Sequence, residues 1–234
     1  SPPFLRARCC CTLPRIDAML DAASQSNVKL TCIFQSRAKK SIQATKNAID
    51  AGRLGKLLFA NALVHWHRSP EYYSNNWRGS LKFDGGGALI NQSIHSIDLL
   101  QWLVGPVKTV FGHTATCVHQ IQGEDTATAS VTFVNGTQGT IQAATSLGQG
   151  FPARIEIHGT RGSVYLQEGS ITQWKVQDTS VDEELEMLNL DQTEDGGAQH
   201  PTNQMKHDAH QLQIEDFVQA ILNNRAPLVS GLEA

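Results

Sequence analysis

The sequence lacks long apolar runs, a strong net charge and a secretory signal, and each absence excludes a class of protein. No stretch approaches the roughly 20 apolar residues that a membrane-spanning helix needs. The formal net charge of −3 gives no electrostatic reason to expect nucleic acid or an anionic membrane as a partner. The first residues show no apolar segment followed by a small-residue cleavage site. We therefore expect a soluble protein without a membrane partner.

The five cysteines follow no disulfide framework. Cys9, Cys10 and Cys11 are consecutive, whereas Cys32 and Cys117 stand alone. An odd number without regular spacing is typical of a reducing compartment, so we expect a cytoplasmic location. Adjacent cysteines fit a tetrahedral zinc site poorly, and we expect no metal there. The motifs of serine hydrolases, zinc peptidases and P-loop proteins are also absent.

What the chain does contain is the composition of a globular domain. It has 234 residues, of which 40% are apolar and 18% charged, and this balance permits a real core. Apolar residues at helical spacing predict helices over about residues 12–27, 39–51, 85–105 and 205–223. Runs rich in β-branched residues predict strands over about residues 28–34, 56–67, 107–118, 125–134, 137–147, 153–158, 163–167 and 171–176. Residues 177–203 are polar and partly acidic, which indicates a long surface excursion.

The order of these elements predicts the fold class. Asn135-Gly136 lies between two strands and is the strongest short signal for a hairpin. Consecutive strands joined by tight turns indicate an antiparallel meander rather than alternating βαβ units. We therefore predict an α+β fold with one large, mainly antiparallel sheet and helices on one of its faces.

The run GGGALINQSIHSIDLLQWL, Gly85 to Leu103, carries polar residues on an otherwise apolar helix. At about 100° per residue, Asn91, His95 and Asp98 fall within an arc of roughly 60°. Burying such groups costs several kcal/mol unless they have partners, so the stripe should face a cleft or satisfy itself internally. Asp98 lies one turn beyond His95, and a carboxylate that supports a histidine is a recurring catalytic arrangement. A buried, internally bonded histidine is the competing interpretation.

The residues around this helix add a possible binding surface. Glycines 85 to 87 permit the close approach of a ligand or of another backbone segment, and the helix N-terminus that follows favours an anion. The preceding loop carries Ser74, Trp77 and Arg78; an arginine suits bidentate anion recognition, and a tryptophan suits stacking on a sugar face or ring. A solvated loop with a packed tryptophan is the alternative. His65 and His67 point to one face of a strand, but the sequence places no third metal ligand with them. His200, His207 and His210 cluster before and within the last helix, where the 207/210 spacing allows metal binding and a solvated helix start is the alternative; we expect no metal site.

The run WRGSLKFDGGGALINQSIHSIDLLQWLVG, Trp77 to Gly105, resembles the signature segment of the Gfo/Idh/MocA oxidoreductases, which are NAD(P)-dependent sugar and cyclitol dehydrogenases. TLPRIDAMLDAASQSNVKL and KNAIDAGRLGKLLFANA resemble the family's linking segments, and HQLQIEDFVQAILNN resembles its late helix. The resemblance implies that residues 12–34 are the edge of a dinucleotide-binding Rossmann domain. It further implies that residues 35–234 form the family's open-faced substrate domain, which forms homo-oligomers through its sheet.

The same resemblance implies roles for individual residues. Family members place a lysine from a Glu-Lys-Pro motif, together with the histidine that matches His95, beside the sugar carbon that gives hydride to NAD or NADP. Asn91 stands where many members have an aspartate, which resembles the branch that oxidises nucleotide-linked N-acetyl sugars such as UDP-N-acetylglucosaminuronate. We therefore expect catalytic roles for His95 and Asn91. We expect substrate contacts from Ser74, Trp77, Arg78, Asn91 and Asp98.

Two departures from the family pattern limit what this chain should do. The Glu-Lys-Pro positions hold Arg6, Ala7 and Arg8, so the catalytic lysine is missing. No glycine-rich turn precedes residue 12, so we expect a truncated chain, with an aberrant segment at residues 1–11, that does not bind NAD tightly and is inactive alone. The main hypothesis is a fragment of a sugar dehydrogenase, and the alternative is a non-catalytic sugar-binding or oligomerisation module. A metal-dependent hydrolase that uses His65, His67 and His95 is a distant third.

Overall fold

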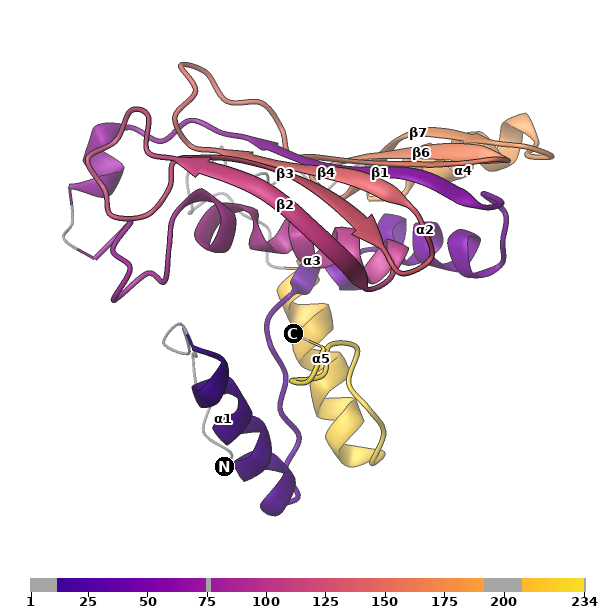
Figure 1. Ribbon diagram of the computed structural model, residues 1–234. Helices are drawn as coiled ribbons and strands as arrows, with labels where there is room; N and C mark the ends of the chain where they lie inside the picture. The colour runs from indigo at the N-terminus through magenta and orange to yellow at the C-terminus, as the bar shows by residue number, and fades with distance from the viewer. Residues whose placement is uncertain (1–11, 75–76, 192–207, 234) are drawn as a thin grey trace.

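A computed structural model describes residues 12–74, 77–191 and 208–233, and a seven-stranded sheet dominates it (Figure 1). Its strands are β1 (Leu57–His65), β2 (Val107–Ala115), β3 (Thr126–Phe133), β4 (Gln138–Ala144), β5 (Arg154–Gly159), β6 (Gly162–Gln167) and β7 (Ser170–Val176). Their spatial order is β2-β3-β4-β1-β5-β6-β7. Only the β1–β4 pair within this sheet is parallel, so the predicted α+β fold with a mainly antiparallel sheet is confirmed.

Local sequence explains both the hairpins and the one parallel pair. Asn135-Gly136 forms the predicted turn between β3 and β4, where Gly136 adopts a φ of 87° and its N–H donates to the carbonyl of Phe133. β1 lies between β4 and β5 in the sheet, so β2 to β7 do not form the uninterrupted meander that the sequence predicts. A glycine is required at position 139 of β4, because a Cβ there would lie 2.0 Å from the carbonyl oxygen of Ala60 in β1.

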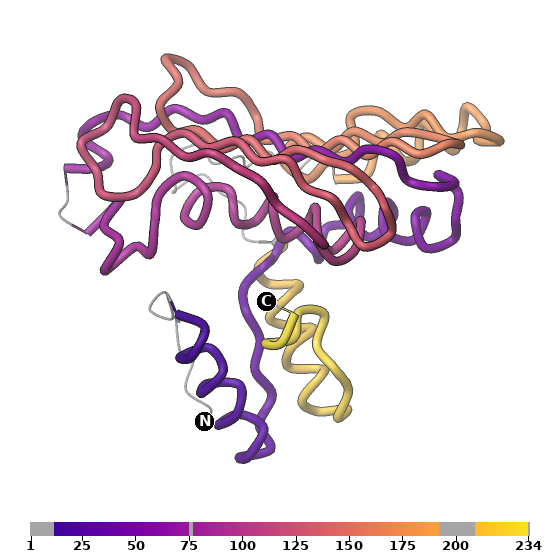
Figure 2. The backbone as a smooth tube through the Cα atoms, viewed as in Figure 1, coloured from indigo at the N-terminus to yellow at the C-terminus, as the bar shows by residue number. Residues whose placement is uncertain are grey.

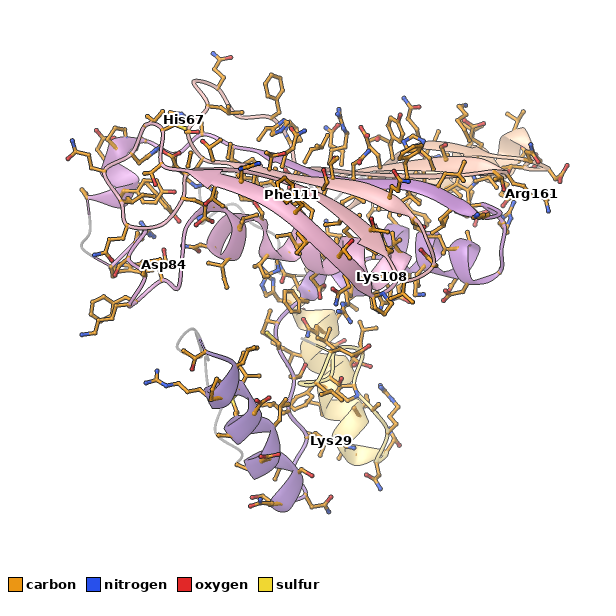
Figure 3. All side chains as sticks on the ribbon, in the orientation of Figure 1. Lys29, His67, Asp84, Lys108, Phe111 and Arg161 are labelled. Atoms are coloured by element: carbon orange, nitrogen blue, oxygen red, sulfur yellow. The ribbon has the colours of Figure 1, made fainter. Side chains whose placement is uncertain are left out.

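Helices cover one face of the sheet and leave the other bare. α2 (Lys40–Asp50) and α3 (Ile94–Val104) lie beneath the strands in Figure 1. The side chains of the opposite face project away from them (Figure 3). The core between helices and sheet includes the fully buried side chains of Ile42, Leu100, Leu103, Ile157 and Trp174. The predicted placement of helices on one face is therefore confirmed.

Two further helices lie away from the sheet. α1 (Leu13–Gln25) and α5 (Asp208–Leu222) extend below the α2 and α3 layer (Figure 2). The predicted strand over residues 28–34 is wrong, because this segment runs as a connection that pairs with no strand among the described residues. Its backbone instead bonds to the C-terminal part of the chain: Gly231 donates to the carbonyl of Leu30, and Gln213 to that of Cys32, at 2.9 and 2.6 Å.

The polar segment after β7 contains a helix that we did not predict. α4 (Val181–Asn189) packs against β7, so the excursion predicted over residues 177–203 is wrong in its first part. Ser180 caps this helix by accepting the backbone N–H of Glu183, and three acidic residues occupy its first turn. Residues 192–203 and the aberrant segment predicted at residues 1–11 lie outside the described residues. In the part that the structure describes, no helix is long and apolar enough to cross a membrane.

Candidate functional site

The glycine-rich run does not open one continuous α-helix. Residues Ala88–Ser93 (η3) form a π-helical turn, and α3 begins only at Ile94. The predicted arc assumed 100° per residue throughout, so it places Asn91 wrongly relative to His95. A π-helical turn is rare and frequently marks a functional site.

The glycines bring two backbone segments together. A Cβ on Gly87 would lie 1.8 Å from the carbonyl oxygen of Glu124, an approach that only glycine permits. The same Glu124 fills the N-terminus of η3: its carboxylate accepts the N–H groups of Gly87 and Leu89 at 3.2 and 2.8 Å, and its carbonyl accepts Ala88 at 2.7 Å. The anion that this N-terminus favours is thus supplied by the protein itself, and the predicted ligand site there is occupied by Glu124.

Asn91 is oriented by a neighbouring carboxylate. Its side-chain N–H₂ donates to Oδ2 of Asp84, and the same oxygen accepts the backbone N–H of Gly79 at 2.9 Å. A carboxylate only accepts hydrogen bonds, so the amide nitrogen must face Asp84. The amide oxygen of Asn91 is therefore the part of this side chain that remains for another partner.

His95 is held in an apolar setting at the start of α3. Its ring meets the ring of Phe34 edge to face, with centroids 5.7 Å apart, and its buried Nδ1 has no hydrogen-bond partner among the described residues. Burial, and to a smaller extent the proximity of His210, lower the pKa of His95. The lowered pKa favours the neutral imidazole, which is the form that can accept a proton.

Asp98 pairs with an arginine rather than with His95. Its two carboxylate oxygens accept Nε and Nη2 of Arg37 at 2.9 and 2.6 Å, and both side chains are buried. The guanidinium also lies over Trp102, 5.4 Å from the ring centroid. Asp98 therefore fixes Arg37 next to Phe34, the residue that contacts His95, and any support that it gives to the histidine is indirect.

The loop before the glycines gathers a basic and aromatic group. The guanidinium of Arg78 lies 4.1 Å from the ring centroid of Tyr72 and 4.8 Å from that of Trp77. Trp77 is 37% exposed. Ser74 is exposed and donates its hydroxyl to the carbonyl of Glu71 at 2.7 Å. The predicted Ser74, Trp77 and Arg78 thus lie on one loop, and Gly79, which follows Arg78, accepts the backbone N–H groups of Gln122 and Gly123 at 3.1 and 2.9 Å.

Several residues of the site had no usable signal in the sequence. Gln92 bonds to Arg68 and so links η3 to the loop. Asp84 orients Asn91, and Glu124 fills the start of η3. Arg68 and Glu124 act through contacts with segments far away in the sequence, which spacing along the chain does not reveal. The strand histidines considered as metal ligands have other partners, since His65 bonds to Gln142. The described residues include no group of three or more side chains that could hold a metal ion.

These features define an open-faced sheet domain in which a π-helical turn bonds through Gln92 to a basic loop and is followed by a helix that carries His95. The GFO/IDH/MocA C-terminal domain matches residues 42–165, which is more than half of the sequence. The chain belongs to the Gfo/Idh/MocA family of oxidoreductases.

Individual relatives agree with this assignment. The chain is 24% identical over 211 residues to the scyllo-inositol 2-dehydrogenase (NAD(+)) of Bacillus subtilis, covering 86% of this chain and 55% of that enzyme. The WlbA dehydrogenase from Bordetella pertussis, solved with NADH and UDP-GlcNAcA, has a TM-score of 0.79 and 29% identity over 95% of this chain and 62% of that one. A levoglucosan dehydrogenase solved with NADH and levoglucosan shares the fold, with a TM-score of 0.76 and 21% identity.

The relatives also bear on the cofactor. Two of these solved structures contain NADH and the Bacillus enzyme is NAD(+)-dependent, so the cofactor predicted for intact family members is confirmed. The chain spans 55% and 62% of the first relatives that it matches. Its described residues include no glycine-rich strand-to-helix turn that could hold a dinucleotide pyrophosphate, so they do not by themselves fit NAD.

Proposed function

We propose that this chain is the substrate-domain part of an NAD(P)-dependent dehydrogenase that oxidises a hydroxyl of a sugar or nucleotide sugar. The observation that carries the proposal is His95, whose buried Nδ1 has no partner among the described residues and which lies in the first turn of α3, directly after the π-helical turn that holds Asn91. When bound, the nicotinamide would accept the hydride. The residues of this chain would position the sugar and take up the hydroxyl proton.

The proton has a natural acceptor in His95. A neutral imidazole within hydrogen-bond reach of a hydroxyl is a general base, and this arrangement typically contributes about 10²–10⁴-fold to a rate. Asn91 would accept a hydrogen bond from a neighbouring substrate hydroxyl through its amide oxygen, because Asp84 holds its nitrogen. Asp98 and Arg37 would act as support, by fixing Phe34 against the histidine.

The basic loop supports an acidic nucleotide sugar as substrate. Arg78 offers a planar guanidinium whose buried Nε has no partner in the described part of the chain, and such a group suits a carboxylate or phosphate. Trp77 next to it would stack on a sugar face, and the Ser74 hydroxyl would add a polar contact. The WlbA structure, which is 29% identical to this chain, contains the acidic nucleotide sugar UDP-GlcNAcA.

The exposed apolar side chains of the N- and C-terminal helices support the proposed domain boundary at residue 34. α1 has no buried residue. The exposed apolar residues of α1, the 28–34 connection and α5 are Leu13, Val28, Ile33, Leu212, Ile214, Val218, Ile221 and Leu222. We infer that residues 12–34 belong to a dinucleotide-binding domain that would cover these side chains, and that residues 35–234 form the substrate domain, inactive alone.

A second candidate function is a non-catalytic module that assembles through its sheet. The bare sheet face favours it. Phe59 lies on the central strand β1, and its large apolar side chain is 53% exposed, as expected of a face that another protein covers. We propose that this face pairs with a second copy of the chain. Light scattering should show a dimer or tetramer that Phe59→Glu converts to a smaller species; an unchanged mass would remove the sheet face as the interface.

Because the substrate domain is proposed to be inactive alone, steady-state kinetics test the proposed function in the intact parent that also carries a dinucleotide-binding domain, which is called the full-length protein below. His95→Ala should lower kcat with UDP-GlcNAcA and NAD by about 10²–10⁴-fold while the circular dichroism spectrum stays unchanged. Gln101→Ala is the matched control, since Gln101 lies exposed on the same helix. A near-normal kcat in His95→Ala would exclude the histidine as the proton acceptor. The activity and the location in the cytoplasm stay predictions.

A further inference from the structure

Gln92 is the point where the π-helical turn and the basic loop meet. Its side chain is 8% exposed. Oε1 accepts two hydrogen bonds from the guanidinium of Arg68, at 3.1 Å from Nε and 2.7 Å from Nη2. Its Nε2 donates to the hydroxyl of Tyr72 at 2.9 Å. Because both ends of the buried amide are bonded, Gln92 holds Arg68 and Tyr72 in one arrangement.

Tyr72 extends this connection to Arg78. Its ring centroid lies 4.1 Å from Cζ of Arg78, and its carbonyl accepts Nη1 of Arg78 at 3.4 Å. Arg68 lies against the same ring at 5.3 Å and against the ring of Trp66 at 5.0 Å. Aromatic rings and cations therefore alternate in one stack, in the order Trp66, Arg68, Tyr72 and Arg78. Gln92 bonds this stack to η3.

The beginning of the loop has a second anchor that does not involve Gln92. His119 donates Nε2 to the carbonyl of Arg68 at 2.9 Å, and its ring meets that of Tyr73 at 4.6 Å. Tyr73 in turn donates its hydroxyl to Thr145, the residue directly after β4, at 2.9 Å. Arg68 and Tyr73 are thus held from the sheet side. The hydroxyl of Tyr72, beneath Arg78, bonds only to Gln92 within the described residues.

We propose that Gln92 is a positioning residue: by holding Tyr72, it fixes the Arg78 guanidinium where that group binds the acidic part of the substrate. The inference rests on the proposed function in one respect, which is that Arg78 contacts the substrate. Gln92 itself is occupied by protein groups and touches no substrate. Its loss should therefore weaken substrate binding and leave the proton transfer at His95 intact.

Calorimetric titration of the full-length protein with UDP-GlcNAcA gives the first readout. Gln92→Leu should raise the Kd about tenfold, the effect expected for losing a hydrogen bond to a charged group. In Gln92→Glu the carboxylate still accepts the hydrogen bonds of Arg68. It can also accept one from the Tyr72 hydroxyl, which then acts as the donor, so the Kd should stay within about threefold of wild type. Gln101→Leu is the matched control. In an Arg78→Ala background, Gln92→Leu should add almost nothing to the Kd.

Hydrogen exchange without ligand gives the second readout and separates the two claims. Gln92→Leu should speed exchange in peptides from the loop at residues 70–80, whereas Gln101→Leu should not. If Gln92→Leu does not fold, Tyr72→Leu breaks the same connection. Unchanged exchange in this loop, or additive losses of affinity in the double variant, would overturn the positioning role. If the loop responds but the wild-type protein binds no UDP-GlcNAcA, the positioning role stands and the proposed substrate falls.

Discussion

Burial decides what His95 can do chemically. A histidine whose pKa is lowered stays neutral through the pH range in which an exposed imidazole gains its proton. The group can then accept a proton from a sugar hydroxyl near pH 7. Phe34 supplies part of this apolar setting, and Phe34 is itself fixed by Arg37 and Asp98.

The pH dependence of activity should report this lowered pKa. The acid limb of kcat/KM should lie below about pH 6.5, the ordinary value for histidine, because desolvation disfavours the imidazolium. Phe34→Ala should move the limb upward by opening the site to water. Rates measured from pH 4.5 to 8 would show both effects, and an acid limb above pH 7 in the wild-type protein would contradict a desolvated His95.

Asn91 provides a test of the amide that Asp84 orients. In Asn91→Asp, two carboxylates would face each other where an amide now donates to Asp84. Like charges at hydrogen-bond distance disfavour ionisation of both groups, so one of the two should keep its proton to a higher pH than an isolated carboxyl does, and the two charges repel each other once both are ionised. We expect KM for UDP-GlcNAcA to rise about tenfold or more and to fall again on acidification. A KM equal to that of the wild type at pH 8 would remove Asn91 from the substrate contacts.

The elements around the site show why some of it follows from sequence. The turn at Asn135-Gly136 depends only on neighbouring residues, so the hairpin was predictable. The same holds for the two faces of β1, along which buried and more exposed residues alternate. The strand predicted over residues 28–34 failed because a β-branched run needs a neighbouring strand, and this run meets the C-terminal segment instead. The π-helical turn of η3 depends on Glu124, which lies over 30 residues from Gly87 and leaves no periodic signal.

The close contact of Gly87 with Glu124 predicts a large loss of stability on substitution. Gly87→Ala would drive a Cβ into the Glu124 carbonyl, so the backbone must separate and the cap on η3 is lost. We expect a cost of roughly 2–4 kcal/mol in the free energy of unfolding. Gly148→Ala is the control, because a Cβ there meets nothing within 4 Å. Urea denaturation that gives equal stabilities for the two variants would contradict the packing described here.

The free energy of unfolding of the whole molecule in acid should depend on the buried carboxylate of Asp125. Burial alone would raise the pKa of Asp125, but the backbone N–H groups of Cys117, His119 and Val118 outweigh it, and the net shift is downward. A group with a lowered folded pKa stabilises the protein above its unfolded pKa of about 3.9 and loses this effect as the pH falls through the folded value. His95 adds a decline that begins below about pH 6.5, because the unfolded chain then binds the extra proton.

This acid dependence can be measured by unfolding the protein between pH 3 and pH 7. The free energy of unfolding should fall from pH 6.5 downward and then more steeply below pH 4. Asp125→Asn should lower it by roughly 2–4 kcal/mol at pH 7, since an amide cannot replace a carboxylate that accepts three backbone N–H groups. It should also flatten the curve below pH 4. A parallel curve for Asp125→Asn would show that another group controls the acid limb.

The central claim is that this domain binds an acidic sugar through the loop that carries Arg78 and takes up the hydroxyl proton at His95. The most direct measurement is the steady-state oxidation of UDP-GlcNAcA by the full-length protein and its Arg78→Ala variant. The account predicts a KM raised about tenfold or more in Arg78→Ala, with kcat little changed, because the guanidinium binds the substrate and takes no part in proton transfer. Equal KM values for the two proteins would contradict the account.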